Sequence, residues 1–555
     1  MFWKKAMKIF NILLAATTVA GTVSAALPCH SEEVLRTNVD PVAVFLDGKE
    51  LDGGWNLMIG EEVDPIETTA REIVFASDTD TLRISLNEWE SKDFTIITAS
   101  GKRAPVRATR ISDNIYENPD PRLLKRGPGG LLSREQAGFD IRALVYALTE
   151  VHPDIFSTCT QEDFFRAVNK AVDTLPDSVS VLELYRRAAP VVAMIGDGHT
   201  NLAFPFNEVF TPELKRMPFW VDVLSDKSIR CRASLDSIIP AGAKILSING
   251  NSAETIVDSM LHFVAGEREP FRLARVDSFF PGLRHLLYPS GEFEVVYQSE
   301  GSHDPQKATF PALPYDEVLR RSPSLDSPND KQPYSYSIDR DRKTAIMDFR
   351  QFNNPAKMEI FADSMFRQLR NEDIDNLVID LRHNGGGNSL VGDILLRYIS
   401  PEPFIQMDKA LIRVSPFTRK LMSHRDISPM FTFYEIPPEQ FIKPLSEEEG
   451  HYSGEVYLLT SNHTFSSAGS FAWAFKECKT GKVIGEETGG MNVCFGDILQ
   501  YRLPVSGLKC SISFKRFWQL RANENDIHGT LPDVAVPASA ALDRALEIID
   551  SKKSK

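Results

Sequence analysis

Residues 376–399 read NLVIDLRHNGGGNSLVGDILLRYI. The short apolar run at 377–379 indicates a buried strand, and three glycines then allow a turn in which the backbone closely approaches a ligand. A helix-like segment follows. The same order recurs on either side, where TAIMDFRQF (344–352) and EVYLLT (455–460) are strand-like and helix-like segments come after them. This alternation predicts a layered α/β fold from residue 343 onward.

The rest of the chain divides into segments with different patterns. Residues 26–125 alternate apolar and polar positions over short runs such as DFTIITAS, which predicts a small β-rich domain. Residues 131–205 have apolar positions at helical spacing, begin with Ser133 as an N-cap, and end near the turn GDGHT. Residues 206–312 mix strand, turn and helix signals, and the polar, proline-containing residues 313–342 predict a linker.

Charge and the N-terminus indicate an exported protein that does not bind nucleic acid. The formal net charge is −14, and non-specific nucleic-acid binding depends on Lys and Arg neutralising phosphates. A lysine-rich start followed by IFNILLAATTVAGTVSAA predicts a secretory signal peptide over residues 1–25. We therefore expect a periplasmic, cell-envelope or secreted bacterial protein, with membrane association only through this segment if it stays uncleaved. Pro28 before Cys29 disfavours lipidation.

Cysteine usage gives no sign of a structural framework. The chain has six cysteines in 555 residues, with no C-x-x-C pair and no His/Cys cluster at zinc spacing. Cys494 and Cys510 flank an apparent hairpin and could pair in an oxidising compartment, so this pairing stays open. We expect no metal and no organic cofactor.

The segment SNHTFSSAGSFAWAFKE (461–477) places serines between a strand and a helix. Backbone N–H groups at a helix N-terminus can stabilise an oxyanion, so a serine here is a candidate nucleophile if a base takes its proton. Ser466, Ser467 and Ser470 are the candidates, and an ordinary N-cap serine is the alternative. No glycine precedes these serines at the offset that G-x-S-x-G requires, and no S-x-x-K brackets the cluster.

Two other motifs carry potential chemistry. In GDGHT, His199 lies in a glycine turn where it could face a cleft and act as a base near neutral pH, although a lone histidine is more often structural. His463 and His528 are rival bases. The glycines at 385–387 could present N–H groups to an anion, with a phosphate loop or a plain tight turn as alternatives.

Taken in order, these elements resemble the S41 family of tail-specific (C-terminal processing) serine peptidases, in its tricorn-like or interphotoreceptor-retinoid-binding-protein-like branch. The matching motifs are EVHPDIF, IGDGHTNL, IPAGAKILSINGNSAETI, LVIDLRHNGGGNS, TFSSAGSFA, VIGEETGG and GTLPDVAV. They cover about residues 131–545 and leave 27–130 unexplained. The resemblance implies a multidomain α/β protein. It would have a crotonase-like α/β catalytic core at 343–545, an N-terminal helical segment, a degenerate PDZ-like insert at 206–312 and the small N-terminal β domain.

The resemblance implies Ser466 as the nucleophile, two positions after Thr464, with Ser467 as the choice if the alignment slips by one place. The best-known members take the proton with a lysine, but Met491 occupies that position here. The DGHT-containing branch uses a histidine, which makes His199 the implied general base.

The implied oxyanion donors are backbone N–H groups from the pair Gly386 and Gly387 and from Ser467. The insert would bind an extended peptide by adding it as a strand to an exposed sheet edge. A peptide or protein is therefore the expected partner.

The third catalytic group is left open, with Glu487 preferred over Asp197 and Glu486. Tricorn-like enzymes have a serine before the histidine and a distant glutamate behind it, whereas Gly198 precedes His199 here. Gly469 also replaces an acid often found in the family.

These features predict an exported serine endopeptidase that hydrolyses peptide bonds of peptides or protein tails through an acyl-enzyme on Ser466, with His199 as general base. The alternative is a catalytically inactive protein on the S41 fold that holds peptide or a hydrophobic ligand, which Met491, Gly198 and Gly469 favour. A hydrolase of non-peptide esters or amides is a third hypothesis.

Overall fold

The computed structural model describes residues 119–206, 211, 214–321, 332–419, 433–438 and 440–553, together with Tyr116 and the backbone of seven short strands between residues 33 and 110. The chain divides into two compact units, one made of Met1–Gly127, Arg142–His152 and Ile412–Tyr434 and the other of Pro128–Ile141, Pro153–Leu411 and Glu435–Lys555. The predicted signal peptide, Cys29 and part of the predicted linker (322–331) lie outside the described residues. No described helix is long and apolar enough to span a membrane.

The described segments between residues 33 and 110 are strands, in agreement with the alternating pattern there. Their order is β1-β6-β7-β2 in one sheet and β3-β4-β5 in another. That residues 26–125 form a separate domain stays a prediction. The strands are β1 (Glu33–Arg36), β2 (Trp55–Ile59), β3 (Glu67–Thr68), β4 (Glu72–Ala76), β5 (Thr81–Ser85), β6 (Ser91–Ile97) and β7 (Arg103–Arg110).

The next segment is helical, as its apolar spacing predicts. The Ser133 Oγ accepts a hydrogen bond from the Gln136 N–H (3.2 Å), and the Gln136 Oε1 accepts one from the Ser133 N–H (2.9 Å). This reciprocal pair is a capping box and fixes where the first helix begins. The elements are η1 (Pro128–Gly130), β8 (Leu132–Ser133), α2 (Arg134–Val151), α3 (Gln161–Asp173), β9 (Ser178–Val179), α4 (Val181–Ala193) and β10 (Asn201–Leu202).

The described part of the following segment contains an antiparallel sheet in strand order β12-β13-β14-β16-β17, together with helices. Ser252 caps α6 by accepting from the Thr255 N–H (3.1 Å). Its elements are β11 (Lys215–Arg216), β12 (Phe219–Val223), β13 (Ile229–Ser234), η2 (Leu235–Ser237), β14 (Lys244–Ile248), β15 (Asn251–Ser252), α6 (Ala253–Leu261), α7 (Glu269–Leu287), β16 (Glu292–Gln298), β17 (Gln306–Pro311), β18 (Leu313–Pro314) and α8 (Tyr315–Arg321).

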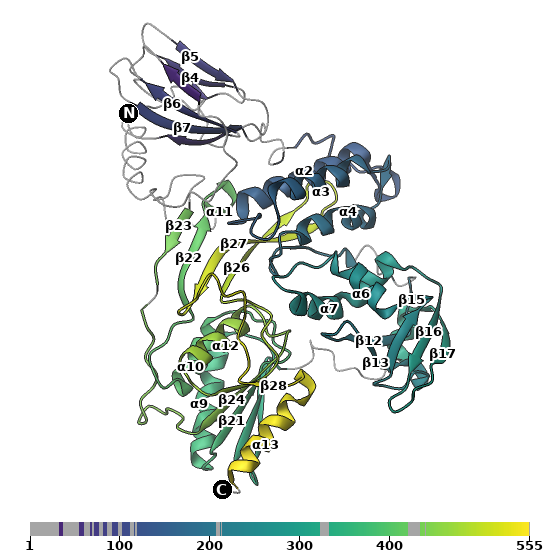
Figure 1. Ribbon diagram of the computed structural model, residues 1–555, viewed down its shortest axis with the longest axis vertical. Coiled ribbons are helices and arrows are strands. Elements are labelled where there is room, and N and C mark those ends of the chain that lie inside the picture. The colour runs from purple at the N-terminus through teal and green to yellow at the C-terminus, as the bar shows by residue number, and fades with distance from the viewer. Residues whose placement is uncertain are drawn as a thin grey trace. The chain divides into compact units, whose positions relative to one another are not determined.

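A mostly parallel sheet, in strand order β19-β20-β21-β24-β25-β28, forms the centre of the next segment. Helices α9, α10 and α12 lie on one face and α13 on the other (Figure 1). The sheet and its helices are β19 (Tyr334–Asp339), β20 (Thr344–Phe349), α9 (Pro355–Asn371), β21 (Asn376–Asp380), α10 (Leu390–Ile399), β24 (Glu455–Thr460), α12 (Ser467–Glu477), β25 (Lys482–Gly485), β28 (Val534–Ala535), η5 (Ala538–Ala540) and α13 (Ala541–Lys553). The predicted multidomain α/β class is confirmed.

Alternation along the buried strands explains the two helical layers. Leu377 and Ile379 pack with the helices α9, α10 and α12, whereas Val378 points to the opposite face and packs with α13. Successive side chains of a strand point to opposite faces, and a parallel sheet covered on both faces reads as a continuous apolar run. The carboxyl ends of β21 and β24 lead into the glycine turn and the serine turn.

A long hairpin of β26 (Val493–Arg502) and β27 (Lys509–Gln519) completes the larger unit, and β10 pairs with β27. Cys494 lies opposite Phe517, so Cys510 is seven positions away along β27. At about 3.3 Å per residue the two cysteines are about 23 Å apart, and both are free. This geometry excludes the Cys494–Cys510 pairing that the sequence left open. The remaining elements are β22 (Met407–Arg413), α11 (Pro416–Arg419) and β23 (Phe433–Ile436).

Candidate active site

Ser466 occupies a strained turn between β24 and α12. Its backbone angles are φ +54° and ψ −129°, and although it is the N-cap residue of α12, its side chain makes no capping hydrogen bond. A non-glycine residue in this region of φ/ψ space costs of order 1–3 kcal/mol and is concentrated at functional sites. The Oγ instead lies 2.9 Å from the Nε2 of His199. The N-cap alternative therefore does not describe what this hydroxyl does.

The turn that carries His199 is held by the β26–β27 hairpin. Asp197 accepts the His199 N–H at Oδ1 (2.9 Å) and the Ser513 hydroxyl at Oδ2 (2.6 Å). Thr200 Oγ1 accepts the Ser513 N–H (3.0 Å). Because Asp197 and Thr200 are both fully buried, these bonds fix the backbone on both sides of the imidazole. The structure thus joins two residues that are 267 positions apart in the chain.

Two phenyl rings pack behind the imidazole, and sequence reasoning identified neither. The ring of Phe465 lies 4.4 Å from that of His199, and Phe271 from α7 stacks on Phe465 at 4.1 Å. A Cβ on Gly198 would lie only 2.5 Å from Phe271 and 2.8 Å from Phe465. Tricorn-like enzymes have a serine at the position of Gly198. Here the two phenyl rings occupy the space that a side chain at this position would need.

The glycine turn lies against the nucleophile but offers fewer free donors than predicted. The Gly386 N–H donates to the Asn384 side-chain oxygen (2.9 Å), so it is already occupied, contrary to the prediction. In the β-bridge between Phe352 and Gly387, the Phe352 N–H donates to the Gly386 carbonyl, and the Asn388 N–H donates to the Phe352 carbonyl. The Gly387 N–H takes no part in this bridge. The Ser467 hydroxyl donates to the Gly387 carbonyl (2.7 Å) and ties this turn to α12. The N–H groups of Gly387 and Ser467 are the remaining candidate donors.

The other predicted serines have different partners. Ser467 Oγ is bonded to the glycine turn, and Ser470 Oγ donates to the Ser466 carbonyl (3.3 Å). Only the Ser466 hydroxyl, among the three candidates, is in contact with a histidine in the described chain.

The structure does not bring Glu487 to His199. Its carboxylate accepts hydrogen bonds from Arg268 (2.6 Å), His528 (3.0 Å) and the Gly529 N–H (2.9 Å). These partners satisfy it in a network of their own, so the preferred third group of the sequence prediction is not placed to orient the imidazole.

The rival residues also lie elsewhere. Glu486 accepts from the Ala538 N–H (3.0 Å) and the Asn462 N–H (3.4 Å). Burial lowers the pKa of His463, and the nearest acid acting on it is Asp277 of α7. His528, the other rival base, is paired with Glu487.

Glu267 is an acidic residue of the site that sequence reasoning missed, because no local pattern marks it. It lies between α6 and α7, and side-chain ligand atoms of Asp197, His199 and Glu267 all lie within 4.8 Å of one another. Three such residues are also the kind that hold metal ions. Because the Nε2 of His199 is engaged with Ser466, Nδ1 is the ring atom that lies near this cluster, 3.8 Å from the Asp197 Oδ1.

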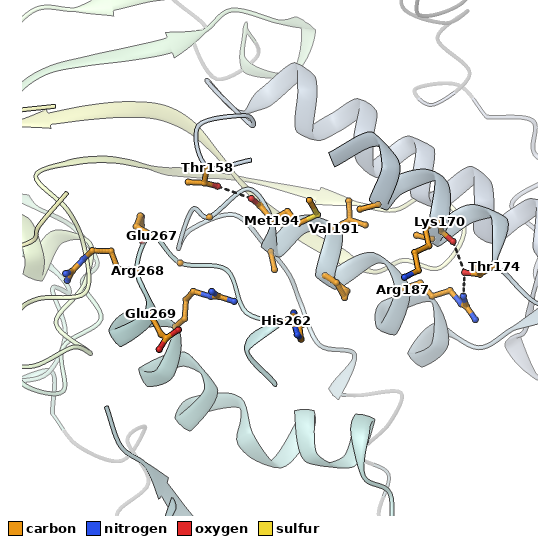
Figure 2. Close-up of a pocket in the computed structure, with 17 residues that line it drawn as sticks. Thr158, Lys170, Thr174, Arg187, Val191, Met194, His262, Glu267, Arg268 and Glu269 are labelled. Carbon is orange, nitrogen blue, oxygen red and sulfur yellow. Dashed lines mark hydrogen bonds between the residues drawn. The ribbon is translucent and has the colours of Figure 1, made fainter. Parts of the chain in front are cut away.

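A cleft of about 630 Å³ lies beside this cluster, between the helical segment and residues 262–272. Figure 2 shows Glu267 and Arg268 at one end of the cleft, with Lys170, Thr174 and Arg187 at the other. The Ser466 hydroxyl and the imidazole do not line it. The cleft is therefore a neighbour of the serine–histidine pair and not the place where the pair acts.

A serine hydroxyl in contact with an imidazole at a strained strand-to-helix turn defines the class of the serine hydrolases. Within that class, residues 343–536 match the model of peptidase family S41, so this part of the chain is similar to that family of serine peptidases.

Solved structures share the fold at low sequence identity. Mature CPAF aligns with a TM-score of 0.56 and 15% identity over 75% of this chain and 96% of its own. Mature CPAF complexed with lactacystin gives 0.56 and 16% over 76% and 98%. The photosystem II D1 C-terminal processing protease matches at 0.38 and 13% over 73% and 94%, too distant to carry an argument. The first two show a common fold.

Proposed function

We propose that this chain is an exported serine endopeptidase that hydrolyses peptide bonds of peptides or protein tails through an acyl-enzyme on Ser466. The observation that carries the proposal is the 2.9 Å contact between the Ser466 Oγ and the His199 Nε2. A serine hydroxyl becomes a useful nucleophile only when a base within hydrogen-bond reach can take its proton.

In the proposed reaction, the Ser466 oxygen attacks the scissile carbonyl while its proton moves to the Nε2 of His199. The resulting imidazolium then gives that proton to the leaving amine as the C–N bond breaks. Water repeats the sequence on the acyl-enzyme: its oxygen attacks the acyl carbonyl while His199 takes its proton, and the imidazolium returns a proton to the Ser466 oxygen as the ester bond breaks and the acid leaves.

The developing oxyanion needs donors that are already in place. We assign this role to the N–H groups of Ser467 and Gly387. Ser467 begins α12, where the first N–H groups have no partner within the helix and the helix dipole is positive. A Cβ on Gly386 would lie 2.9 Å from the Ser467 nitrogen, which leaves room there only for glycine.

The substrate would reach this site as an extended peptide. We infer that residues 206–312 are a PDZ-like module and that residues 343–545 form a crotonase-like core, as the resemblance implies. The exposed edge strands of the insert, β12 and β17, are the places where a peptide could add as a strand.

A fluorophosphonate probe tests the proposal without a known substrate. Wild-type protein should be labelled at Ser466, whereas Ser466→Ala and His199→Ala should not be labelled. Ser470→Ala is the matched control, because it removes a hydroxyl one turn further along α12 that donates to the Ser466 carbonyl (3.3 Å) and accepts from the Gln519 Nε2 (3.4 Å). His528→Ala, which removes an exposed histidine, is the control for His199.

The competing function is a catalytically inactive binding protein on the same fold. If folded wild-type protein is not labelled, the peptidase proposal is rejected and the binding protein becomes the better hypothesis. If it is labelled but hydrolyses only esters, the substrate class in the proposal is wrong.

A further inference from the structure

The Nδ1 atom of His199 lacks an acceptor in the described structure, although the proposed chemistry needs one. This nitrogen is shielded from solvent and has no hydrogen-bond partner there. A histidine that removes a serine proton at Nε2 carries its own proton at Nδ1, and an acid bonded to that N–H holds the tautomer and stabilises the imidazolium. Some group must therefore face this atom.

Asp197 is near but already engaged. Its Oδ1 lies 3.8 Å from the His199 Nδ1, beyond hydrogen-bond distance. Both of its oxygens accept hydrogen bonds, one from the His199 backbone N–H and one from the Ser513 hydroxyl. Asp197 thus fixes the backbone of the turn, and its carboxylate would have to move away from these two hydrogen bonds to reach the ring.

The carboxylate of Glu267 is not engaged in the way that the carboxylate of Asp197 is. Both of its oxygens are shielded from solvent and lack a well-formed hydrogen bond among the described residues, although the backbone N–H groups of Glu267 itself and of Gly198 lie near enough to lower its pKa. A Cβ on Gly198 would lie 3.0 Å from its Oε2, so the carboxylate packs against the residue that precedes His199. An unsatisfied buried carboxylate is costly, and each one in a native structure calls for an explanation.

We propose that Glu267 is the positioning residue of the catalytic site, accepting the Nδ1–H of His199 as the Ser466 proton moves to Nε2. This inference rests on the proposed peptidase function. The loose spacing of the substrate-free site is not an objection, because catalytic hydrogen bonds often shorten only in the complex with substrate.

The charged surroundings suit such a role. The Arg275 guanidinium of α7 donates to the Gly198 carbonyl (2.5 Å) and offsets part of the negative charge of Glu267 and Asp197. The Cys494 thiol on β26 also faces these acids, and burial raises its pKa, so it stays neutral. Burial first and the Asp197 charge second raise the pKa of Glu267 to about 7, while His199 lowers it.

The position of Glu267 in the chain makes the proposed active site depend on residues 206–312. It comes from the α6–α7 loop of residues 206–312, not from the domain that carries Ser466. The next residue, Arg268, pairs with Glu487 (2.6 Å) and donates to the Thr488 carbonyl (3.4 Å). The insert is thus attached to the site at two consecutive residues, and the S41 domain alone lacks the carboxylate that completes it.

The test is the second-order rate of fluorophosphonate labelling from about pH 5 to pH 9, with EDTA present, for the full chain carrying Glu267→Gln, Glu267→Ala or Glu267→Asp. Glu269→Gln is the matched control, since Glu269 lies two positions further on, at the first residue of α7, with an exposed side chain paired to Lys227. We expect Glu267→Gln to label about 10- to 100-fold more slowly at alkaline pH, with unchanged or higher thermal stability, and Glu267→Asp to recover part of the rate.

The pH profile separates positioning from a purely structural role. If both His199 and Glu267 must lose a proton, the wild-type rate falls steeply on the acid side, and Glu267→Gln makes that fall shallower because one titration is removed. A Glu267→Gln rate within about twofold of wild type across the range overturns the inference while leaving the peptidase proposal intact. Absence of labelling in folded wild type rejects the peptidase proposal and this inference with it.

Discussion

Replacing Gly198 by alanine tests how the imidazole is held. Gly198 does not have a positive φ, so alanine can adopt its backbone without strain, and the effect is purely steric. The new Cβ would lie 2.5 Å from the Phe271 ring, 2.8 Å from the Phe465 ring and 3.0 Å from the Glu267 Oε2. Carbon atoms rest at about 3.5–4.0 Å, so the shortfall is about 1 Å on two sides. The backbone that carries His199 must move.

We expect Gly198→Ala to lower both the stability and the activity of the protein. Overpacking a closed site of this kind costs about 1–3 kcal/mol, which the chain should survive. A 1 Å displacement of a catalytic group costs about 10²-fold in rate. We therefore expect Gly198→Ala to lower the fluorophosphonate labelling rate about 100-fold while lowering the melting temperature only by a few degrees.

Gly469→Ala provides the matched control for this change. Gly469 is three residues after Ser466 in α12, and an added Cβ would find its nearest neighbour, the Thr464 carbonyl oxygen, at 4.0 Å. Glycine inside a helix is about 0.5–1 kcal/mol less stable than alanine, so this variant should melt slightly higher and label normally. Wild-type labelling by Gly198→Ala would refute the idea that aromatic packing sets the imidazole position.

Three further outcomes follow from the same geometry. Gly387→Ala places a Cβ 2.2 Å from a backbone oxygen at φ +140°, so labelling should be lost, and labelling at the wild-type rate would contradict the proposed glycine-turn packing. Arg268→Ala breaks a mostly buried pair with Glu487 (side chains 13% and 17% exposed); it should lower the free energy of unfolding by about 1–3 kcal/mol, whereas Arg166→Ala, at an exposed pair, should leave it nearly unchanged. The raised pKa of Glu267 means that the folded chain keeps a proton that the unfolded chain loses between pH 4.5 and about 7, so this residue makes stability fall as pH rises through that window. The stability gained by Glu267→Gln, measured by denaturant unfolding, should therefore grow from near zero below that window to its largest value above it, and a gain independent of pH would contradict this.

The strand-to-helix turns could be predicted because their signals are local. Apolar strands running into glycines or serines, as at 376–387 and 455–467, predict the parallel sheet and the edge at which its turns gather. The contact between Ser466 and His199 could not be predicted from periodicity, because 267 residues separate them. Only the resemblance to a family in which both motifs occur in order made that pairing an expectation.

The supporting residues of the site gave no local signal. Glu267 and Phe271 lie in an ordinary loop and an ordinary helix of a separate segment, and only tertiary packing brings them beside His199. Glu487 was preferred because it lies in a family motif, yet Arg268 and His528 satisfy its carboxylate instead. A titratable residue near a motif in sequence is thus a weak guide to what touches the imidazole, because that is decided by which side chains lack other partners.

The cost of the serine turn distinguishes a peptidase from an inactive binding protein on this fold. Ser466 keeps φ at +54°, and its hydroxyl leaves the end of α12 uncapped. Left-handed backbone at a non-glycine residue costs about 1–2 kcal/mol, and a missing N-cap costs about 1 kcal/mol more. A protein that only held a ligand would gain both by letting this residue relax into an ordinary cap. In the sequence, Gly198 favoured the inactive alternative. In the structure, phenyl rings occupy the space that a side chain at position 198 would need, so the glycine is not evidence of a lost catalytic group. The strain is explained if the hydroxyl must face His199, and Ser466→Ala should then be more stable than wild type only if the alanine lets the turn relax.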